Sequence, residues 1–326
     1  MGQSNFDVVT ANAFIGSQFL TQGNTFFVKP ATGGDGNDGK SPKRAFKTLP
    51  EAYDHLVAGQ NDVVYLMAES DSAGGTTDYQ GATLNWNKDL CHLIGVNSGP
   101  RMSQRSRVAF TSTYAGASNL FTLSANGCLI QGVEFYAGVA SVNPTGCMLV
   151  TGERNHVRKC HIAGMGNTAN DIAGAYSVQL SGAGAGENLF DDCVIGLNTL
   201  TLGAHLNSQI LCAGYAARNT FRNCLVQMFT NHATNHVFLR APAASIDRYL
   251  IFEDTQFLNA IDSGSTGLTE AFVVVATSNG TVLLLGGRTG FVGATDWNST
   301  DSGNVRSIDG SITSATFGLG VAVTQS

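Results

Sequence analysis

The adjacent carboxylates Asp191 and Asp192 come closest, of all the residues in this sequence, to a catalytic arrangement. Two neighbouring acids can share the work of glycoside hydrolysis, since one protonates the leaving oxygen while the other activates water. His205, in the tripeptide Gly203-Ala-His205, is the histidine that could join them. Asp191, Asp192 and His205 are therefore the candidate catalytic residues of a glycan-cleaving enzyme.

The residues that could bind a metal ion form weaker patterns than the acidic pair does. Asp35, Asn37 and Asp38 could offer oxygen ligands to calcium, but their spacing lacks the later glutamate of a calcium-binding loop, and the surrounding glycines favour a turn. His232 and His236 are four residues apart, which on a helix would place both on one face. Their strand-like surroundings favour an ordinary loop instead. We expect neither a metal nor another cofactor, with Asp35 and Asp38 as the alternative metal ligands.

The acidic pair belongs to a repeated segment. An amide, an apolar residue, two polar residues, a cysteine and a second apolar residue recur in the same order three times. The cysteines are separated by 33 and then 31 residues, which is typical of a solenoid built from stacked coils. The three copies occupy residues 155–162, 188–195 and 219–226.

The polar pair of each repeat changes sign from copy to copy. Equivalent positions hold Arg158-Lys159, Asp191-Asp192, Arg222-Asn223 and, one coil later, Glu253-Asp254. Because stacked parallel strands lie about 4.8 Å apart, opposite charges would face each other along the stack. The pattern therefore favours a structural ladder of charges over a catalytic acid pair.

The composition agrees with a strand-rich solenoid. The chain has 326 residues, of which 43% are hydrophobic and 13% charged, with 39 glycines against 6 prolines. A charged fraction about half the usual quarter hints at surface covered by partners. The net charge of −6 contains no block of like charges, so we expect no direct binding to nucleic acid and none to a membrane.

Seven cysteines without a Cys-x-x-Cys pair indicate core thiols in a reducing compartment rather than a disulfide framework. Residues 1–6 lack the basic start and apolar core of a secretory signal. The sequence therefore favours synthesis in a reducing cytoplasm. A rung-to-rung disulfide stays open as an alternative.

Three segments are expected along the chain. Residues 1–24 form an extended N-terminal arm, 25–306 a parallel β-helix, and 307–326 a C-terminal strand or cap. A capping helix is expected near 48–57, where an N-cap threonine, an early proline and one apolar face coincide. Pairing the strand-like segments by eye predicts about nine coils and a rod of about 40 Å.

The segment from Phe27 to Ala52 carries a family resemblance. It contains Phe-Val-Lys-Pro, a Gly-Asp-Gly-Asn-Asp-Gly turn, Ser-Pro and Ala-Phe-Lys-Thr-Leu. It resembles the N-terminal cap of pectate-lyase-like right-handed parallel β-helices, which implies an all-β, single-stranded solenoid. That family includes polysaccharide lyases and hydrolases, phage tailspikes and virion proteins without enzymatic activity, so the likeness alone does not select a function. The Gly-His-Gly and Arg-x-Lys motifs of the hydrolases are not found.

These observations together favour a structural phage protein over an enzyme. We expect a capsid decoration or other head-surface component of the virion, docked on other virion subunits by its arm and one β-helix face, as a homo-oligomer. The alternative is a tailspike-like, tail-associated polysaccharide depolymerase that would use the acidic residues named above.

Overall fold

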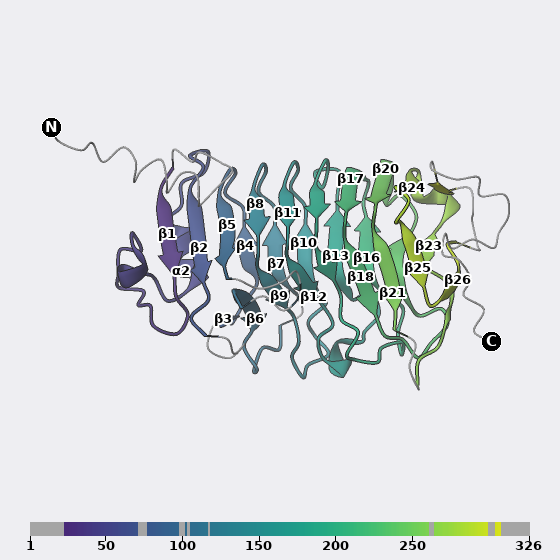
Figure 1. The fold of residues 1–326 in the computed structure, drawn as a ribbon, viewed down its shortest axis with the longest axis horizontal. Helices are drawn as coiled ribbons and strands as arrows, with labels where there is room; N and C mark the ends of the chain where they lie inside the picture. The colour runs from purple at the N-terminus through teal and green to yellow at the C-terminus, as the bar shows by residue number, and fades with distance from the viewer. Residues whose placement is uncertain are drawn as a thin grey trace.

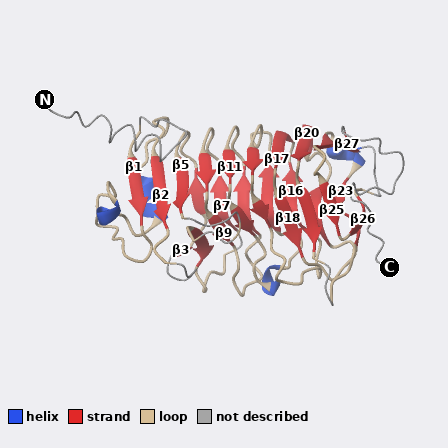
Figure 2. Ribbon diagram, viewed as in Figure 1, coloured by secondary structure: helices blue, strands red, loops and turns tan. Residues whose placement is uncertain are grey.

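The chain folds into a rod of stacked coils. The computed structural model describes residues 23–70, 77–97, 102, 105–116, 118–260, 264–298 and 304–307. Three parallel sheets run along the rod, and the chain passes from one sheet to the next in every coil (Figure 1). Strands dominate and helices are few and short (Figure 2). The all-β parallel β-helix expected from the sequence is confirmed.

Sheet A holds ten described strands, all paired in parallel with their neighbours. In order along the rod they are β1 (Thr25–Val28), β2 (Val63–Met67), β5 (His92–Val96), β8 (Leu129–Gln131), β11 (His156–Arg158), β14 (Leu189–Asp191), β17 (Ala216–Arg222), β20 (Ile246–Glu253), β24 (Thr281–Leu285) and β27 (Val305–Ser307).

Sheet B follows sheet A within each coil and holds eight described strands. They are β3 (Thr77–Gln80), β6 (Arg107–Phe110), β9 (Glu134–Tyr136), β12 (His161–Ala163), β15 (Val194–Ile195), β18 (Leu225–Met228), β21 (Gln256–Asn259) and β25 (Gly290–Val292).

Sheet C closes each coil with seven described strands. They are β4 (Leu84–Trp86), β7 (Asn119–Leu123), β10 (Gly146–Val150), β13 (Tyr176–Ser181), β16 (Asn207–Ala213), β19 (His236–Ala241) and β23 (Phe272–Val274). A small sheet pairs β22 (Leu268–Glu270) with β26 (Ala294–Asp296).

The expected nine coils overcount the complete turns. About seven turns contribute a strand to all three sheets in the described chain. The count was too high because β1 extends sheet A alone at the N-terminal end, whereas β24, β25 and β27 at the C-terminal end belong to turns without a strand in sheet C. The complete turns of the described chain therefore run from β2 to β23.

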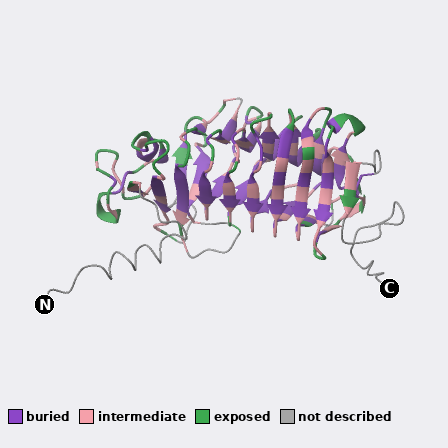
Figure 3. Ribbon diagram, turned by 90° about the horizontal axis from the view of Figure 1, so that it is seen from above, coloured by how far each residue is buried: buried purple, intermediate pink, exposed green. Residues whose placement is uncertain are grey.

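The core consists of apolar residues stacked in columns, and buried residues run through the rod from end to end (Figure 3). Phe190, Phe221 and Phe252 face inward from β14, β17 and β20. Their ring centroids lie 4.5 and 5.3 Å apart in stacked geometry. Because each ring is fully buried, the column contributes both hydrophobic burial and ring contacts.

A second column consists of the amides that open each repeat. The backbone N–H of Asn155 donates to Asn188 Oδ1 at 3.0 Å, and the N–H of Asn188 donates to Asn219 Oδ1 at the same distance. Each side-chain Nδ2 donates to a carbonyl in the preceding coil. The amides therefore satisfy the backbone at the corner where the chain enters sheet A, which explains why an amide recurs there.

The N-terminal end is closed by helix α2 (Leu49–Asp54), which lies inside the expected range but is shorter. Thr48 caps it by accepting from the N–H of Glu51. The open edge of β1 is also covered, because Phe27 pairs through its backbone with Gly39 and Phe46. Three short 3-10 turns, Pro42–Arg44, Thr168–Asn170 and Ala276–Ser278, complete the described helical elements.

The predictions for both chain ends fall largely outside this description. The arm at residues 1–22 and the strand or cap at 308–326 lie outside the described residues. No helix in the described part of the chain is both long and apolar enough to cross a membrane.

Candidate functional site

The acidic pair lies at the tight turn that leads from sheet A into sheet B. The second residue of each polar pair adopts a left-handed backbone conformation, with φ of 50° at Lys159, 56° at Asp192, 53° at Asn223 and 48° at Asp254. The N–H of Asp192 donates to the Arg222 carbonyl of the next coil at 2.9 Å, and the other three make the equivalent bond. Asp192 is therefore a turn residue whose backbone holds two coils together.

The first residue of each polar pair forms a column on the outer face of sheet A. Arg158, Asp191, Arg222 and Glu253 are direct neighbours on consecutive strands, as the sequence predicts. Arg222 Nε donates to Asp191 Oδ1 at 3.0 Å, and His156 Nε2 lies 3.8 Å from Asp191 Oδ2. The charges thus alternate along the rod and join neighbouring coils.

This column sets the protonation of Asp191. Burial by itself raises the pKa of the Asp191 carboxyl, but the hydrogen bond and charge of Arg222 outweigh burial and hold that pKa below its ordinary value. A general acid needs the opposite shift, because it must carry a proton near neutral pH. Asp191 is therefore suited to ion pairing.

A second ionic column, which we did not predict, borders the other end of sheet A. Glu187 accepts from Arg154 Nε at 2.8 Å and from Arg218 Nη2 at 2.6 Å. Each of the three residues also has a positive φ, between 52° and 58°. Each directly precedes the repeated asparagine, so the alternating signs at that position were a usable signal.

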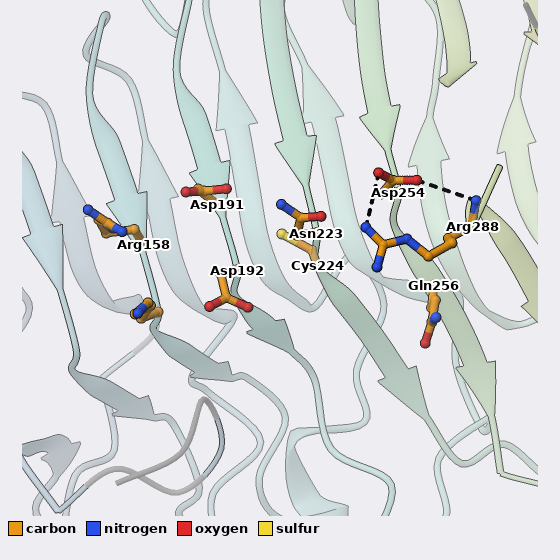
Figure 4. A pocket seen from close by; sticks show the side chains of 9 residues that line it. Arg158, Asp191, Asp192, Asn223, Cys224, Asp254, Gln256 and Arg288 are labelled. Atoms are coloured by element: carbon orange, nitrogen blue, oxygen red, sulfur yellow. Dashed lines mark hydrogen bonds and ion pairs between the residues drawn. The ribbon is translucent and has the colours of Figure 1, made fainter. Parts of the chain in front are cut away.

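A polar groove of about 390 Å³ lies over the turn between sheets A and B (Figure 4). Asp254 accepts from Arg288 Nη2 at 3.3 Å within it. Acids, bases and amides alternate along its length, so the groove can offer both hydrogen-bond donors and acceptors to a polar ligand. Its lining includes Lys159, Asp191, Asp192, Asn223, Asp254, Gln256 and Arg288.

The remaining candidate residues lie elsewhere. His205 is exposed in the loop between β15 and β16, where sheet B leads to sheet C, whereas the acids lie between sheets A and B. Asp35 accepts from the backbone N–H groups of Lys47 and Thr48, and Asp38 pairs with Arg44 at 3.0 Å. Both cap-loop acids have structural partners.

The two histidines that are four residues apart in the sequence also lie in different surroundings. His232 lies in a loop, whereas His236 opens β19, is fully buried and has its Nε2 2.8 Å from Gln209 Nε2. Burial lowers the pKa of His236 to about 4, so it is neutral near pH 7. Among the described residues, no group of three or more His, Cys, Asp or Glu side chains is arranged to hold a metal ion.

Sequence reasoning missed a buried charged cluster on the outer face of sheet B. Glu134, only 2% exposed, lies 2.8 Å from Arg107 Nη2 and 3.8 Å from His161 Nδ1. Burial raises the pKa of Glu134 against the opposing charge of Arg107, and burial lowers the pKa of His161 to about 4. Glu134 and His161 occupy equivalent positions in their coils, one residue before a core position, which was the available signal.

The order of the strands in the three sheets defines an all-β parallel β-helix, and the fold implied by the N-terminal resemblance is confirmed. No protein-family model matches the sequence, and no curated protein does so.

Three solved structures illustrate the likeness. A pectate lyase superposes with a TM-score of 0.49 and 13% identity, covering 81% of this chain and 63% of the lyase, so this chain spans less than two thirds of its length. A pectin methylesterase in complex with a hexasaccharide gives 0.46 and 14%, covering 87% of this chain and 92% of the other. A rhamnogalacturonan lyase gives 0.35 and 14%, with 80% and 87% covered. These identities concern the fold alone.

Proposed function

We propose that this chain is a structural component of a phage particle, a capsid decoration or other head-surface protein. It is made in the host cytoplasm and acts in the virion as a rigid rod. Its partners are other virion subunits and further copies of itself, contacted through the N-terminal arm and one face of the β-helix.

The ion pair between Asp191 and Arg222 is the observation that carries this proposal. The carboxylate with the best claim to catalysis is held in its charged form by a neighbouring coil, at 3.0 Å. Asp192 contributes its backbone to the same inter-coil contact. Residues that join neighbouring coils stiffen the rod, and rigidity is the property that a spacer or decoration protein needs.

Two half-buried aromatic rings, Phe27 and Tyr65, support docking near the N-terminal end. Tyr65 packs against a cluster of Val63, Ile94 and Leu129, which is separate from the main core and at most 7% exposed. Phe27 stacks on Tyr65 with ring centroids 5.6 Å apart, and both rings are only half-buried. We place the docking face here, beside the start of the described chain.

The proposal is tested on purified particles of the phage that encodes the chain. Quantitative mass spectrometry should find the protein at a fixed copy number per particle, and gold-labelled antibodies should decorate the head. A protein that stays at the top of a density gradient as a soluble monomer, separate from the particles, would overturn the proposal.

A glycan depolymerase is the second candidate, favoured by the polar groove alone. Asp192 and Asp254 present carboxylates to a groove that could hold several sugar units. The test incubates the protein with host surface polysaccharides and follows their chain length. Cleavage by the native chain that disappears in Asp192→Ala, but persists in the cap-loop control Asp35→Ala, would establish this function in place of the structural one.

A further inference from the structure

The cysteines of the three repeats form a column of thiols inside the turn between sheets A and B. Cys160, Cys193 and Cys224 occupy the same position in consecutive coils, between strands that are in register on both sides. All three are free and at most 2% exposed. Val133 and Thr255 hold the equivalent positions in the flanking coils, so the column has defined ends.

The contacts of the sulfur atoms repeat from coil to coil. Cys193 Sγ donates to the carbonyl of Asp191 at 3.5 Å and to that of Val157 in the preceding coil at 3.4 Å. Cys224 Sγ makes the matching contacts to Arg222 at 3.3 Å and Phe190 at 3.5 Å. Because each thiol has the same surroundings shifted by one coil, neighbouring sulfurs are separated by about one strand spacing, roughly 4.8 Å.

That spacing matches a two-coordinate metal. A metal–thiolate bond is about 2.3 Å long, so an ion midway between two sulfurs needs them about 4.6 Å apart. Zinc prefers four tetrahedral ligands, which a straight column does not supply, whereas thiolates select soft ions such as Cu(I). We propose that adjacent thiols of this column bind one soft monovalent cation, Cu(I) or Ag(I), in linear coordination.

Binding of the metal ion requires no oxidation or reduction. The cation forms two metal–sulfur bonds, one to a thiolate and one to a neutral thiol, and a single proton leaves to solvent. The product is neutral, which suits a buried site.

The groove supplies a route to the column. Cys224, the last thiol of the column, is one of the residues that line it (Figure 4). An ion that enters the groove therefore meets the last thiol of the column first, and can bind between Cys224 and Cys193.

The same reasoning predicts a second site at another corner. Cys91 and Cys128 are also adjacent in register, because the residues two positions later, Leu93 and Ile130, are paired neighbours on β5 and β8. Both thiols are buried, and the column continues as Asn155, whose Oδ1 accepts from the N–H of Cys128. The native chain should therefore bind two soft ions, one in each column.

Silver ion is the probe, because it is soft, monovalent and not oxidised by air. Native mass spectrometry counts the bound ions, and near-ultraviolet absorbance follows metal–thiolate bonds. We expect two silver ions on the native chain and one on Cys193→Ser, because Cys160 and Cys224 are then about 9.6 Å apart, two strand spacings. Cys160→Ser, the matched control, should keep two ions because Cys193 and Cys224 still pair.

The result that overturns the proposal is an equal count for Cys193→Ser and Cys160→Ser. Circular dichroism and the thermal midpoint of each variant show whether it is folded. If Cys193→Ser is unfolded, Cys193→Ala and the two-site variant Cys160→Ser with Cys224→Ser replace it, and each must lose one ion relative to Cys160→Ser alone. Ion counts that follow the number of cysteines, rather than their adjacency, would also contradict the proposal.

Discussion

The carboxyl of Asp78 should make the stability of the whole rod depend on pH. Asp78 faces inward from β3, is only 3% exposed, and accepts from the N–H of Leu49 at 3.1 Å and from Gln80 Nε2 at 2.6 Å. Burial outweighs these bonds and raises its pKa from 3.8 to about 7. The carboxyl thus sits beneath the start of α2, where the cap meets the first coils.

The direction in which stability changes with pH follows from the raised pKa of Asp78. The folded state binds the Asp78 proton more tightly than the unfolded chain does, so this contribution to stability is complete below pH 4 and is lost as the pH rises through about 7. A rise from 3.8 to about 7, at about 1.4 kcal/mol per pKa unit, sets an upper bound of about 4 kcal/mol. Asp78→Asn keeps the shape and an acceptor oxygen but removes the titration.

The assay is chemical unfolding of the native chain and Asp78→Asn between pH 4 and 8. The variant should gain stability relative to the native chain as the pH rises, by about 2–4 kcal/mol over the range. Asp54→Asn, an exposed change on the nearby helix α2, controls for the loss of one negative charge. A difference between the native chain and Asp78→Asn that stays constant with pH would refute the reasoning.

Three further predictions concern the columns, each measured as the free energy of unfolding in urea. Phe221→Ala should cost about 3–5 kcal/mol, because it leaves a cavity between two stacked rings; a cost below about 1 kcal/mol would contradict a packed core. Asn188→Ala should cost about 2–3 kcal/mol, because it strands the buried N–H of Asn155; a cost below about 0.5 kcal/mol would show that this hydrogen bond does not stabilise the coil. Arg222→Ala should cost no more than about 1 kcal/mol, because Arg222 is 41% exposed, and 1 M salt should reduce the difference; a salt-independent cost would argue against ion pairing with Asp191.

The columns could be predicted because the repeat is visible in the sequence. Once Cys160, Cys193 and Cys224 are aligned, residues at the same offset within the eight-residue repeat fall in one column. The charge column on sheet A follows directly from that alignment, and the structure shows it in register. The N-terminal cap followed from a local motif and a helix pattern.

The residues that the sequence analysis did not single out are those whose role depends on burial. The alternation of a strand would place Glu134 and His161 on an outer face, yet both are almost fully buried. Asp78 is likewise inward-facing despite its charge, beneath a helix about 30 residues earlier in the chain. Spacing shows which face a side chain takes, but it does not show what lies over that face, because the covering contacts join distant parts of the chain.

The charge column also has a consequence for the order of the coils during folding. The phenylalanine, asparagine and cysteine columns are the same in successive coils, so they would accept a chain that skipped one coil and stacked on the next. In that misthreaded form Arg158 would face Arg222, and Asp191 would face Glu253. Because the correct order places unlike charges together and the skip of one coil places like charges together, the alternating signs disfavour that misthreaded form.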